Sequence, residues 1–230
     1  MARLRHRALF FRMQAFIHLC LIILTWSAYF ALHSALASAG VKHWLAQRFP
    51  AFMPLYRVTY NLLALIFLIP PSLLTLIYPG PELWRWRGPL GWLADGLALA
   101  AVAGFVWSLR YYDGMNFLGL RQWRDQSANV DGSAQFTISP LHRYVRHPWY
   151  FFMLVILWTR DMTAGGLVFA VVATLYLVIG SRYEEEKLIA LHGNRYVDYR
   201  ARVAGLIPRR GRTLTEAEAR QLSTPDKTRT

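Results

Sequence analysis

The sequence is poor in cysteine and in acidic residues, and it lacks the short motifs of several common enzyme classes. Its single cysteine, Cys20, rules out an internal disulfide. Asp and Glu together number 13, against 26 Lys and Arg. The chain contains no G-x-G-x-x-G, no Walker-type glycine loop, no H-E-x-x-H and no G-x-S-x-G elbow. These absences argue against a soluble nucleotide-binding enzyme, a zinc protease and an α/β-hydrolase, and we expect no metal site.

Long apolar runs dominate the sequence instead. Hydrophobic residues make up 55% of the 230 residues, and several runs approach the ~20 residues that cross a ~30 Å hydrocarbon layer. The net charge of +13 lies between and after these runs, where positive residues normally set membrane orientation. We therefore expect the basic residues to face a lipid bilayer and not a nucleic acid. The sequence leaves the oligomeric state open.

The apolar pattern predicts an all-α, polytopic integral membrane protein with about five transmembrane helices. The first three spans are expected at residues 14–39, 58–78 and 90–112. Between the first two lies an amphipathic interfacial segment that Pro50 and Pro54 interrupt. A cleaved signal peptide is the alternative for the first run, because a basic start precedes it and small residues end it.

The rest of the chain is predicted to fold as a helical hairpin between polar segments. A loop at residues 113–139 is long enough to serve as a lid. A short apolar helix would begin at Pro148, and a return helix would end near Gly193. The expected divisions are residues 1–112 for the N-terminal transmembrane helices, 113–207 for the catalytic loop, hairpin and cofactor-binding helix, and 208–230 for a mobile polar tail.

Positive residues also predict an orientation. Most Lys and Arg residues that flank the spans fall on the side of the hairpin ends, which places the C-terminus and a pocket between those ends in the cytoplasm. The arginines before Met13 would then lie on the opposite side, and a start of translation at Met13 would remove them.

Basic residues precede the hairpin and acidic residues follow it, so folding it would bring opposite charges to one level. Arg146 could clamp a ligand carboxylate or phosphate, and Glu184 or Glu185 could hold an ammonium or act as a base. Taken singly, each residue is better explained as an interface anchor, or as a partner of Arg182 and Lys187 on the same helix. Their combination favours a functional pocket at a membrane surface.

The two ends of the hairpin resemble a known family. RYVRHPWY, followed after about thirty residues by EEEKLIALHGNRYVDYRARV, is similar to the phospholipid and isoprenylcysteine methyltransferase superfamily, whose pattern is R-H-P-x-Y-x-G, a hydrophobic hairpin, and E-E-x-x-L with F-G-x-x-Y-x-x-Y. The resemblance implies a cytosol-facing pocket for S-adenosylmethionine and an acceptor that enters from the membrane. It implies catalytic roles for Glu185 and Arg146. The implied cofactor-binding residues are His142, Tyr144, Arg146, His147, Pro148, Tyr150, Glu184, Glu185 and Tyr196.

The chain departs from that pattern at two positions. Phe152 stands where the pattern has glycine, which would crowd a close contact between helices. His192 replaces the phenylalanine before Gly193. Both departures affect the details of the expected cofactor pocket.

The N-terminal half carries a narrower likeness. The segments ALHSALAS, VKHWL, YRVTYNLLAL and FLGLRQW are similar to methanethiol S-methyltransferases and to NnrU-type membrane proteins. The likeness places His33, Lys42, Arg57 and Asn61 near the substrate side. A hydrogen bond between two helices explains His33 equally well.

The function expected from these resemblances is S-adenosylmethionine-dependent methyl transfer to a small thiol or a lipid-like acceptor within the membrane. Two alternatives stay open at this point. One is a non-catalytic NnrU-like membrane subunit, and the other is a nicotinamide-dependent membrane reductase of the same architecture.

Overall fold

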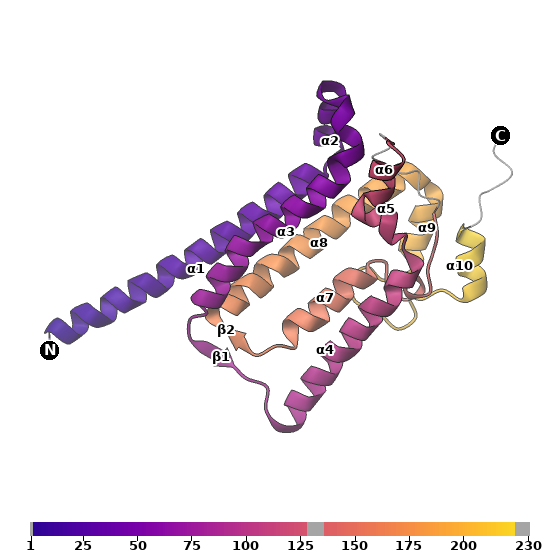
Figure 1. Cartoon of the computed structure of the whole chain (residues 1–230). Coiled ribbons are helices and arrows are strands. Elements are labelled where there is room, and N and C mark those ends of the chain that lie inside the picture. The colour runs from indigo at the N-terminus through magenta and orange to yellow at the C-terminus, as the bar shows by residue number, and fades with distance from the viewer. Residues whose placement is uncertain (1, 128–135, 224–230) are drawn as a thin grey trace. The chain divides into compact units, whose positions relative to one another are not determined.

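The computed structural model describes residues 2–127 and 136–223, and within them the prediction of an all-α membrane protein is confirmed. Four described helices are long and apolar enough to cross a membrane. They lie at Arg12–Ala37, Pro50–Ile77, Gly88–Tyr111 and Ala164–His192. The fifth predicted span corresponds to an apolar helix of 11 residues, Pro148–Trp158, which is shorter than the ~17–25 residues that a spanning helix needs. Figure 1 shows the helices in chain order.

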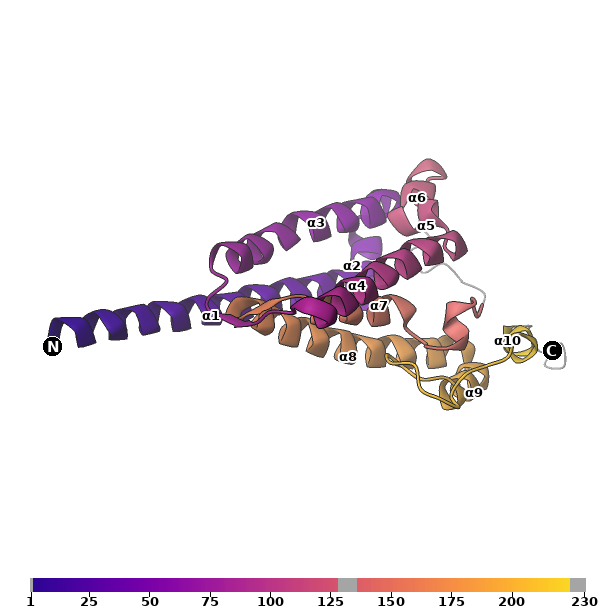
Figure 2. The ribbon, with the colours of Figure 1, turned by 90° about the horizontal axis from the view of Figure 1, so that it is seen from below.

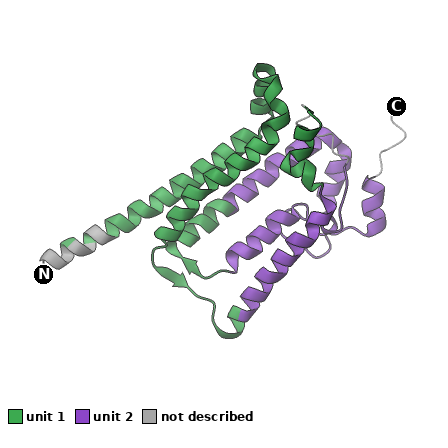
Figure 3. Cartoon of the chain, viewed as in Figure 1, with its two compact units in different colours: residues 1–91, 113–131, 160–173 green, residues 92–112, 132–159, 174–230 purple. Residues whose placement is uncertain are grey.

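The chain divides into two compact units, which are coloured separately in Figure 3. Unit 1 comprises Met1–Gly91, Asp113–Asp131 and Arg160–Ala173. Unit 2 comprises Trp92–Tyr112, Gly132–Thr159 and Thr174–Thr230. Two parts of the predicted polar segments, residues 128–135 of the loop and 224–230 of the tail, lie outside the described residues.

Unit 1 is built on two long helices that run alongside each other (Figures 1 and 2). Its elements are α1 (Ala2–Ala37), α2 (Ala39–Arg48), η1 (Pro50–Phe52), α3 (Met53–Ile77), β1 (Glu82–Trp84), α5 (Gly114–Leu118), α6 (Leu120–Arg124), β2 (Met162–Thr163) and the start of α8 (Ala164–His192). Between α1 and α3, the indole N–H of Trp26 donates to Thr75 Oγ1 over 2.9 Å. Ile22 on α1 is fully buried, so this face of the first helix is a packing face.

Prolines set helix boundaries in unit 1 differently from the sequence prediction. Ser38 caps α2 by accepting the Val41 N–H over 3.3 Å, which separates α2 from α1. Pro54 does not interrupt the chain but occupies the first turn of α3, where its missing N–H costs nothing. The second span therefore begins at Met53 and continues as one helix through Pro70 and Pro71.

Unit 2 holds the hairpin region. Its elements are α4 (Gly88–Ser108, from Trp92 on), η2 (Leu109–Tyr111), η3 (Leu141–Arg143), α7 (Pro148–Trp158), the rest of α8, α9 (Asn194–Arg202) and α10 (Glu216–Ser223). Pro148 begins α7 and Gly193, at φ +57°, follows the last residue of α8, as the sequence predicts. These two positions mark the start of the first hairpin helix and the end of the second.

A glycine on α4 accommodates the phenylalanine that the superfamily pattern lacks. The α4 and α7 helices lie side by side in Figures 1 and 2. A Cβ built on Gly104 would lie only 2.7 Å from Cζ of Phe152, whose side chain is 9% exposed. The crowding expected at Phe152 is therefore relieved by the absence of a side chain opposite it. One turn away, Trp149 Nε1 donates to Ser108 Oγ over 2.7 Å.

The segment after Pro208 is not a uniformly polar tail. A buried cluster in unit 2 joins Phe136, Tyr196, Tyr199, Val203, Leu214 and Ala219. Leu214 is 2% exposed, and the α10 helix that follows it contributes Ala219. Because only three apolar residues of this segment, Leu214, Ala219 and Leu222, pack on the cluster, the sequence carries too little periodicity to reveal the contact.

Candidate functional site

The backbone of the R-H-P motif, Arg146 to Pro148, is held by hydrogen bonds to residues that follow α9. Val145 pairs in parallel with Ala204 in an isolated bridge. The Arg146 N–H donates to the Ala204 carbonyl over 2.8 Å, and the His147 N–H donates to the Gly205 carbonyl over 3.2 Å. Pro148 then starts α7. The side chains of Arg146 and His147 are thereby held at the point where residues beyond α9 meet the start of α7.

A single buried carboxylate receives both of these side chains. Glu185 projects from α8 and is 5% exposed. Its Oε1 accepts from Arg146 Nε at 2.8 Å and Nη2 at 2.7 Å, and lies 3.1 Å from Nε2 of His147. Its Oε2 lies 3.1 Å from Nε of Arg200. Three cationic groups from two segments, the residues before α7 and the α9 helix, therefore converge on one acid.

Arg146 uses its whole guanidinium inside the protein. Besides Glu185, it contacts two carbonyls, since Nη1 donates to Arg200 O over 3.0 Å and to Val203 O. The carboxylate that this arginine contacts in the structure is that of Glu185. Arg146 ties α7, α8 and the end of α9 together, which is the geometry of a positioning residue.

His147 lies between two carboxylates. Its Nε2 faces Glu185, and its Nδ1 lies 3.3 Å from Oε2 of Glu184. Burial alone would lower the pKa of His147, but the hydrogen bonds to Glu184 and Glu185 outweigh it and raise the pKa above its ordinary value. Since both ring nitrogens need a proton to donate, we infer a charged imidazolium whose ring stacks on Tyr150 at 5.2 Å.

Glu184 is the accessible member of the acidic pair. Its side chain is 49% exposed, against 6% for Glu185. Its charge acts on two neighbouring rings. Burial and then the Glu184 charge raise the pKa of Tyr112 to about 12. Burial and then the His147 charge lower the pKa of His142 to about 4, against the opposing pull of Glu184. At neutral pH the site therefore offers one accessible anion beside an uncharged imidazole.

The remaining aromatic residues of the predicted set divide into buried and exposed groups. Tyr196 is 2% exposed in the apolar cluster, and burial is the main cause that raises its pKa. Tyr199, which the pattern also matches, donates from its hydroxyl to the His142 carbonyl over 2.8 Å. Tyr144 is 49% exposed beside Arg143 and has no contact with the acidic pair among the described residues. The structure thus brings together every predicted cofactor residue of unit 2 except Tyr144, although their roles in binding stay predictions.

An arginine-rich cavity that the sequence interpretation missed includes Glu185 in its wall. We call it the arginine cavity. It has a volume of about 440 Å³ and is lined by Arg146, Val178, Ser181, Arg182, Glu185, Arg200, Ala204, Gly205, Leu206, Ile207, Arg209 and Arg212. Glu184 is not part of the lining. The signal in the sequence was the basic run after Pro208, which we had interpreted as part of a tail.

Unit 1 contains a separate cavity lined by every predicted substrate-side residue. Its volume is about 310 Å³, and its walls are His33, Leu36, Ala37, Lys42, Tyr56, Arg57, Tyr60, Asn61 and Phe117. All four segments of the narrower likeness contribute to these walls. Short motifs far apart in sequence therefore meet around one space.

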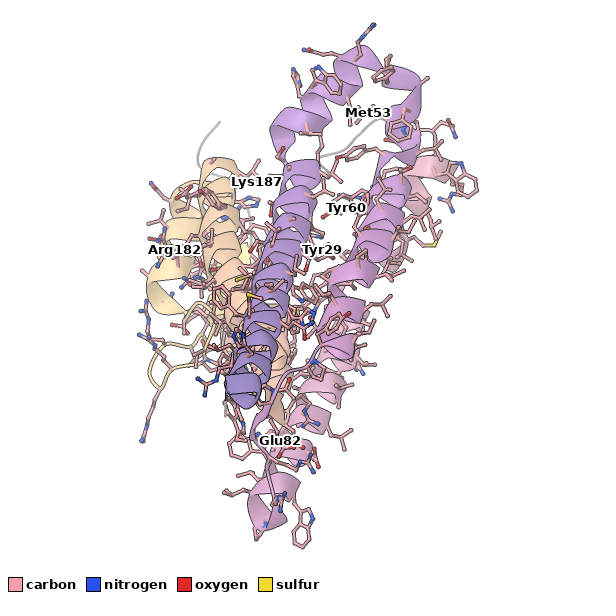
Figure 4. The ribbon with its side chains drawn as sticks, turned by 90° about the vertical axis from the view of Figure 1, so that its left-hand side faces the viewer. Tyr29, Met53, Tyr60, Glu82, Arg182 and Lys187 are labelled. Atoms are coloured by element: carbon pink, nitrogen blue, oxygen red, sulfur yellow. The ribbon has the colours of Figure 1, made fainter. Side chains whose placement is uncertain are left out.

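The contacts in this cavity explain why its polar residues occur together. His33 Nε2 lies 2.8 Å from the Tyr60 hydroxyl, so the helix-to-helix hydrogen bond is present (Figure 4 shows Tyr60 on the side of α3 that faces α1). Arg57 donates to Asn116 O over 2.8 Å, and Asn61 donates to the carbonyl of Phe117 over 3.2 Å. These bonds hold α5 against α3.

The described residues contain no group of three or more His, Cys, Asp or Glu side chains that could hold a metal ion. The site chemistry of these residues is therefore that of arginine, histidine, carboxylate and aromatic groups.

Comparison with known proteins gives relatives of one kind. The chain is 34% identical over 192 residues to methanethiol S-methyltransferase 2 of Bradyrhizobium diazoefficiens. This alignment covers 77% of this chain and 68% of that protein. It is 34% identical over 195 residues to a methanethiol S-methyltransferase of Mycobacterium tuberculosis, covering 76% and 72% of the two chains. A methanethiol S-methyltransferase of Pseudomonas deceptionensis is 33% identical over 189 residues, or 76% and 67%. No family model and no solved structure matches.

Proposed function

This chain belongs to the methanethiol S-methyltransferase family, and we propose that it transfers a methyl group from S-adenosylmethionine to a small thiol. The observation that carries the proposal is the different accessibility of two adjacent acids. Glu185 is contacted by Arg146, His147 and Arg200, whereas Glu184 keeps about half of its side chain accessible. His147 holds this accessible carboxylate next to the buried ion-pair cluster, where it is available to a cationic ligand.

The residues around Glu184 fit S-adenosylmethionine. The cofactor carries an ammonium and a sulfonium, and Glu184 offers the complementary negative charge. The ring of Tyr112 offers an aromatic face, which attracts cations, and His142 is uncharged at neutral pH and so does not repel them. When bound, the cofactor supplies an activated methyl group that can undergo in-line displacement.

The buried residues would act by holding Glu184 in place. His147 donates to both Glu184 and Glu185, so the position of the accessible acid depends on the buried one. Arg146 fixes Glu185 against the carbonyls of residues 200 and 203. We therefore assign positioning roles to Arg146 and Glu185, in place of the direct catalytic roles that the sequence resemblance implied.

A small thiol is the acceptor that the relatives support. These relatives are named for methanethiol as the acceptor, and a lipid-like acceptor has no such support. The attacking sulfur must lose its proton, because the thiolate and not the thiol is the nucleophile. The cavity of unit 1, with Lys42 and Arg57 in its walls, offers cationic groups that would favour a thiolate. The C-terminus and the Glu184 site are proposed to face the cytoplasm, where most of the flanking positive residues would lie.

Calorimetry on the detergent-purified chain tests this proposal. We expect S-adenosylmethionine and S-adenosylhomocysteine to bind and NADPH not to bind. With S-adenosylmethionine and methanethiol, the chain should release dimethyl sulfide, which headspace gas chromatography detects. Binding of NADPH alone would favour a reductase, and binding of none of the three would favour a non-catalytic subunit.

A matched pair of variants tests the site. Glu184→Gln should weaken S-adenosylmethionine binding about tenfold, which corresponds to ~1.4 kcal/mol. Glu186→Gln removes the same charge two residues further along α8. The Glu186 side chain is exposed and forms no ion pair with the site among the described residues, so affinity should stay unchanged. Equal affinities in the two variants, with both folded, would refute the assignment of Glu184.

A further inference from the structure

We propose that the arginine cavity binds a phosphate group, separately from the methyl-transfer site. The inference rests on a surplus of arginines around one cavity. Five of the lining residues are arginines, and Glu185 is the lining residue that carries negative charge. Arginine presents planar forks of N–H donors that match phosphate oxygens, so converging arginines are the usual construction of a phosphate site.

The surplus remains after the internal ion pairs are assigned. Arg146 and Arg200 are neutralised by Glu185. Among the described residues, Arg182, Arg209 and Arg212 form no ion pair with a carboxylate. Arg212 donates instead to the Ala201 carbonyl over 2.6 Å, which holds its position without neutralising its charge. Three uncompensated cations in one cavity repel one another, and a bound anion would relieve that repulsion.

The cavity is built from segments that the protein fixes in place. Arg182 comes from α8, whereas Arg209 and Arg212 come from the chain between α9 and α10. That chain is tied down at both ends, because Arg146 donates to Val203 O and the Leu214 N–H donates to Arg143 O over 3.0 Å. The backbone that carries Arg209 and Arg212 is therefore held in place, which reduces the cost of ordering these side chains around a ligand.

The apolar part of the lining indicates what the phosphate could be attached to. Val178, Leu206 and Ile207 line the same cavity as the arginines. Ile207 is 64% exposed, and Ile179 and Leu175 on the membrane-spanning part of α8 are 52% and 55% exposed. A phosphate headgroup would contact the arginines, and an attached acyl chain would contact the exposed apolar residues. Basic pockets beside transmembrane helices bind anionic lipid headgroups in this way. A soluble phosphate would contact the arginines alone.

Charge also separates this cavity from the methyl donor. S-adenosylmethionine carries two positive groups and one carboxylate, so a surplus of arginines would oppose its binding. Glu184, the accessible acid of the methyl-transfer site, does not line the cavity. The accessible acid of the methyl-transfer site and the surplus arginines of the cavity thus carry opposite charge.

Titrations of the full detergent-purified chain test the proposal. The probes are dihexanoyl phosphatidylglycerol, inorganic phosphate and the zwitterionic dihexanoyl phosphatidylcholine, with binding followed by thermophoresis below their micellar concentrations. The test variant is Arg182→Gln with Arg209→Gln, because both side chains are exposed and neither holds Glu185. The matched control is Arg87→Gln with Arg110→Gln, two exposed arginines outside the cavity, which removes the same net charge.

We expect phosphatidylglycerol to bind the native chain and the control alike, about tenfold more weakly in the cavity variant, and phosphatidylcholine to bind none of them. The same pattern with inorganic phosphate at similar affinity would support the phosphate site with a soluble ligand as its source. Equal weakening in both variants, or no weakening, would overturn the proposal. Weakening of S-adenosylmethionine binding alone in the cavity variant would also overturn it, because the cavity would then belong to the methyl donor.

Discussion

Replacing Glu185 by glutamine should destabilise the protein strongly, although the change alters one atom. The carboxylate is 5% exposed and is contacted by Arg146, His147 and Arg200. An amide at this position removes the negative charge and turns one acceptor oxygen into a donor that faces other donors. Arg146, whose side chain is 11% exposed, and His147, at 5%, would keep their charges without a buried partner.

The size of this effect follows from the burial of the pair. Breaking a buried ion pair by removing one partner costs ~3–5 kcal/mol. Arg200 is 49% exposed and can turn to solvent, so the lower end of that range, about 3 kcal/mol, is the appropriate figure. For a chain of this size that cost corresponds to a fall in melting temperature of about 6–12 °C.

Thermal unfolding in one detergent, followed by circular dichroism, measures the effect, and Glu184→Gln is the control. Glu184 has the same chemistry one residue earlier, but its side chain is 49% exposed, so its loss should shift the melting temperature by at most a third as much. If Glu185→Gln melted within 2 °C of the native chain, or if the two variants were equally destabilised, the buried cluster would not be the support that we describe.

Two further predictions concern packing and pH. Gly104→Ala should destabilise the α4 and α7 contact by about 1–3 kcal/mol, because its Cβ would lie 2.7 Å from the Phe152 ring, and Phe152→Leu should recover part of that loss in a double-mutant cycle of melting temperatures. Stability should fall by about 3 kcal/mol as the pH drops from about 6.5 to about 4, since the pKa of His142 is lowered to about 4 and the unfolded state binds more protons in that window. A His142→Gln chain, titrated in parallel by thermal unfolding, should lack this part of the pH dependence, and an unchanged slope would contradict the reasoning.

Local signals in the sequence were enough to predict the helices and the ends of the hairpin. Pro148 and Gly193 mark boundaries by backbone chemistry alone, and long apolar runs predict spans from composition. The prediction of helix boundaries failed where one residue type fits two local structures. Pro54 fits both a break and a first helical turn, and only the packing of the preceding turn decides between them.

The sequence predicted which residues form the site, but not which glutamate pairs with which cationic residue. Three consecutive glutamates on a helix point about 100° apart, and the rotation of α8 decides which of them is buried. That rotation depends on contacts from distant segments and cannot be obtained from the local sequence. The arginine cavity was missed for the same reason, because Arg182, Arg209 and Arg212 meet only after the chain beyond α9 has docked.

The contacts of Arg146 also bear on the order in which the chain can fold during synthesis. Its partners, Glu185 and the carbonyls of residues 200 and 203, lie 39, 54 and 57 residues further along the chain. At ribosomal rates of ~5–20 residues per second, several seconds pass before the last of them exists. During that interval the arginine at the start of α7 must stay hydrated or be shielded by the insertion machinery. The site is therefore completed late, after the preceding helices have been delivered to the bilayer.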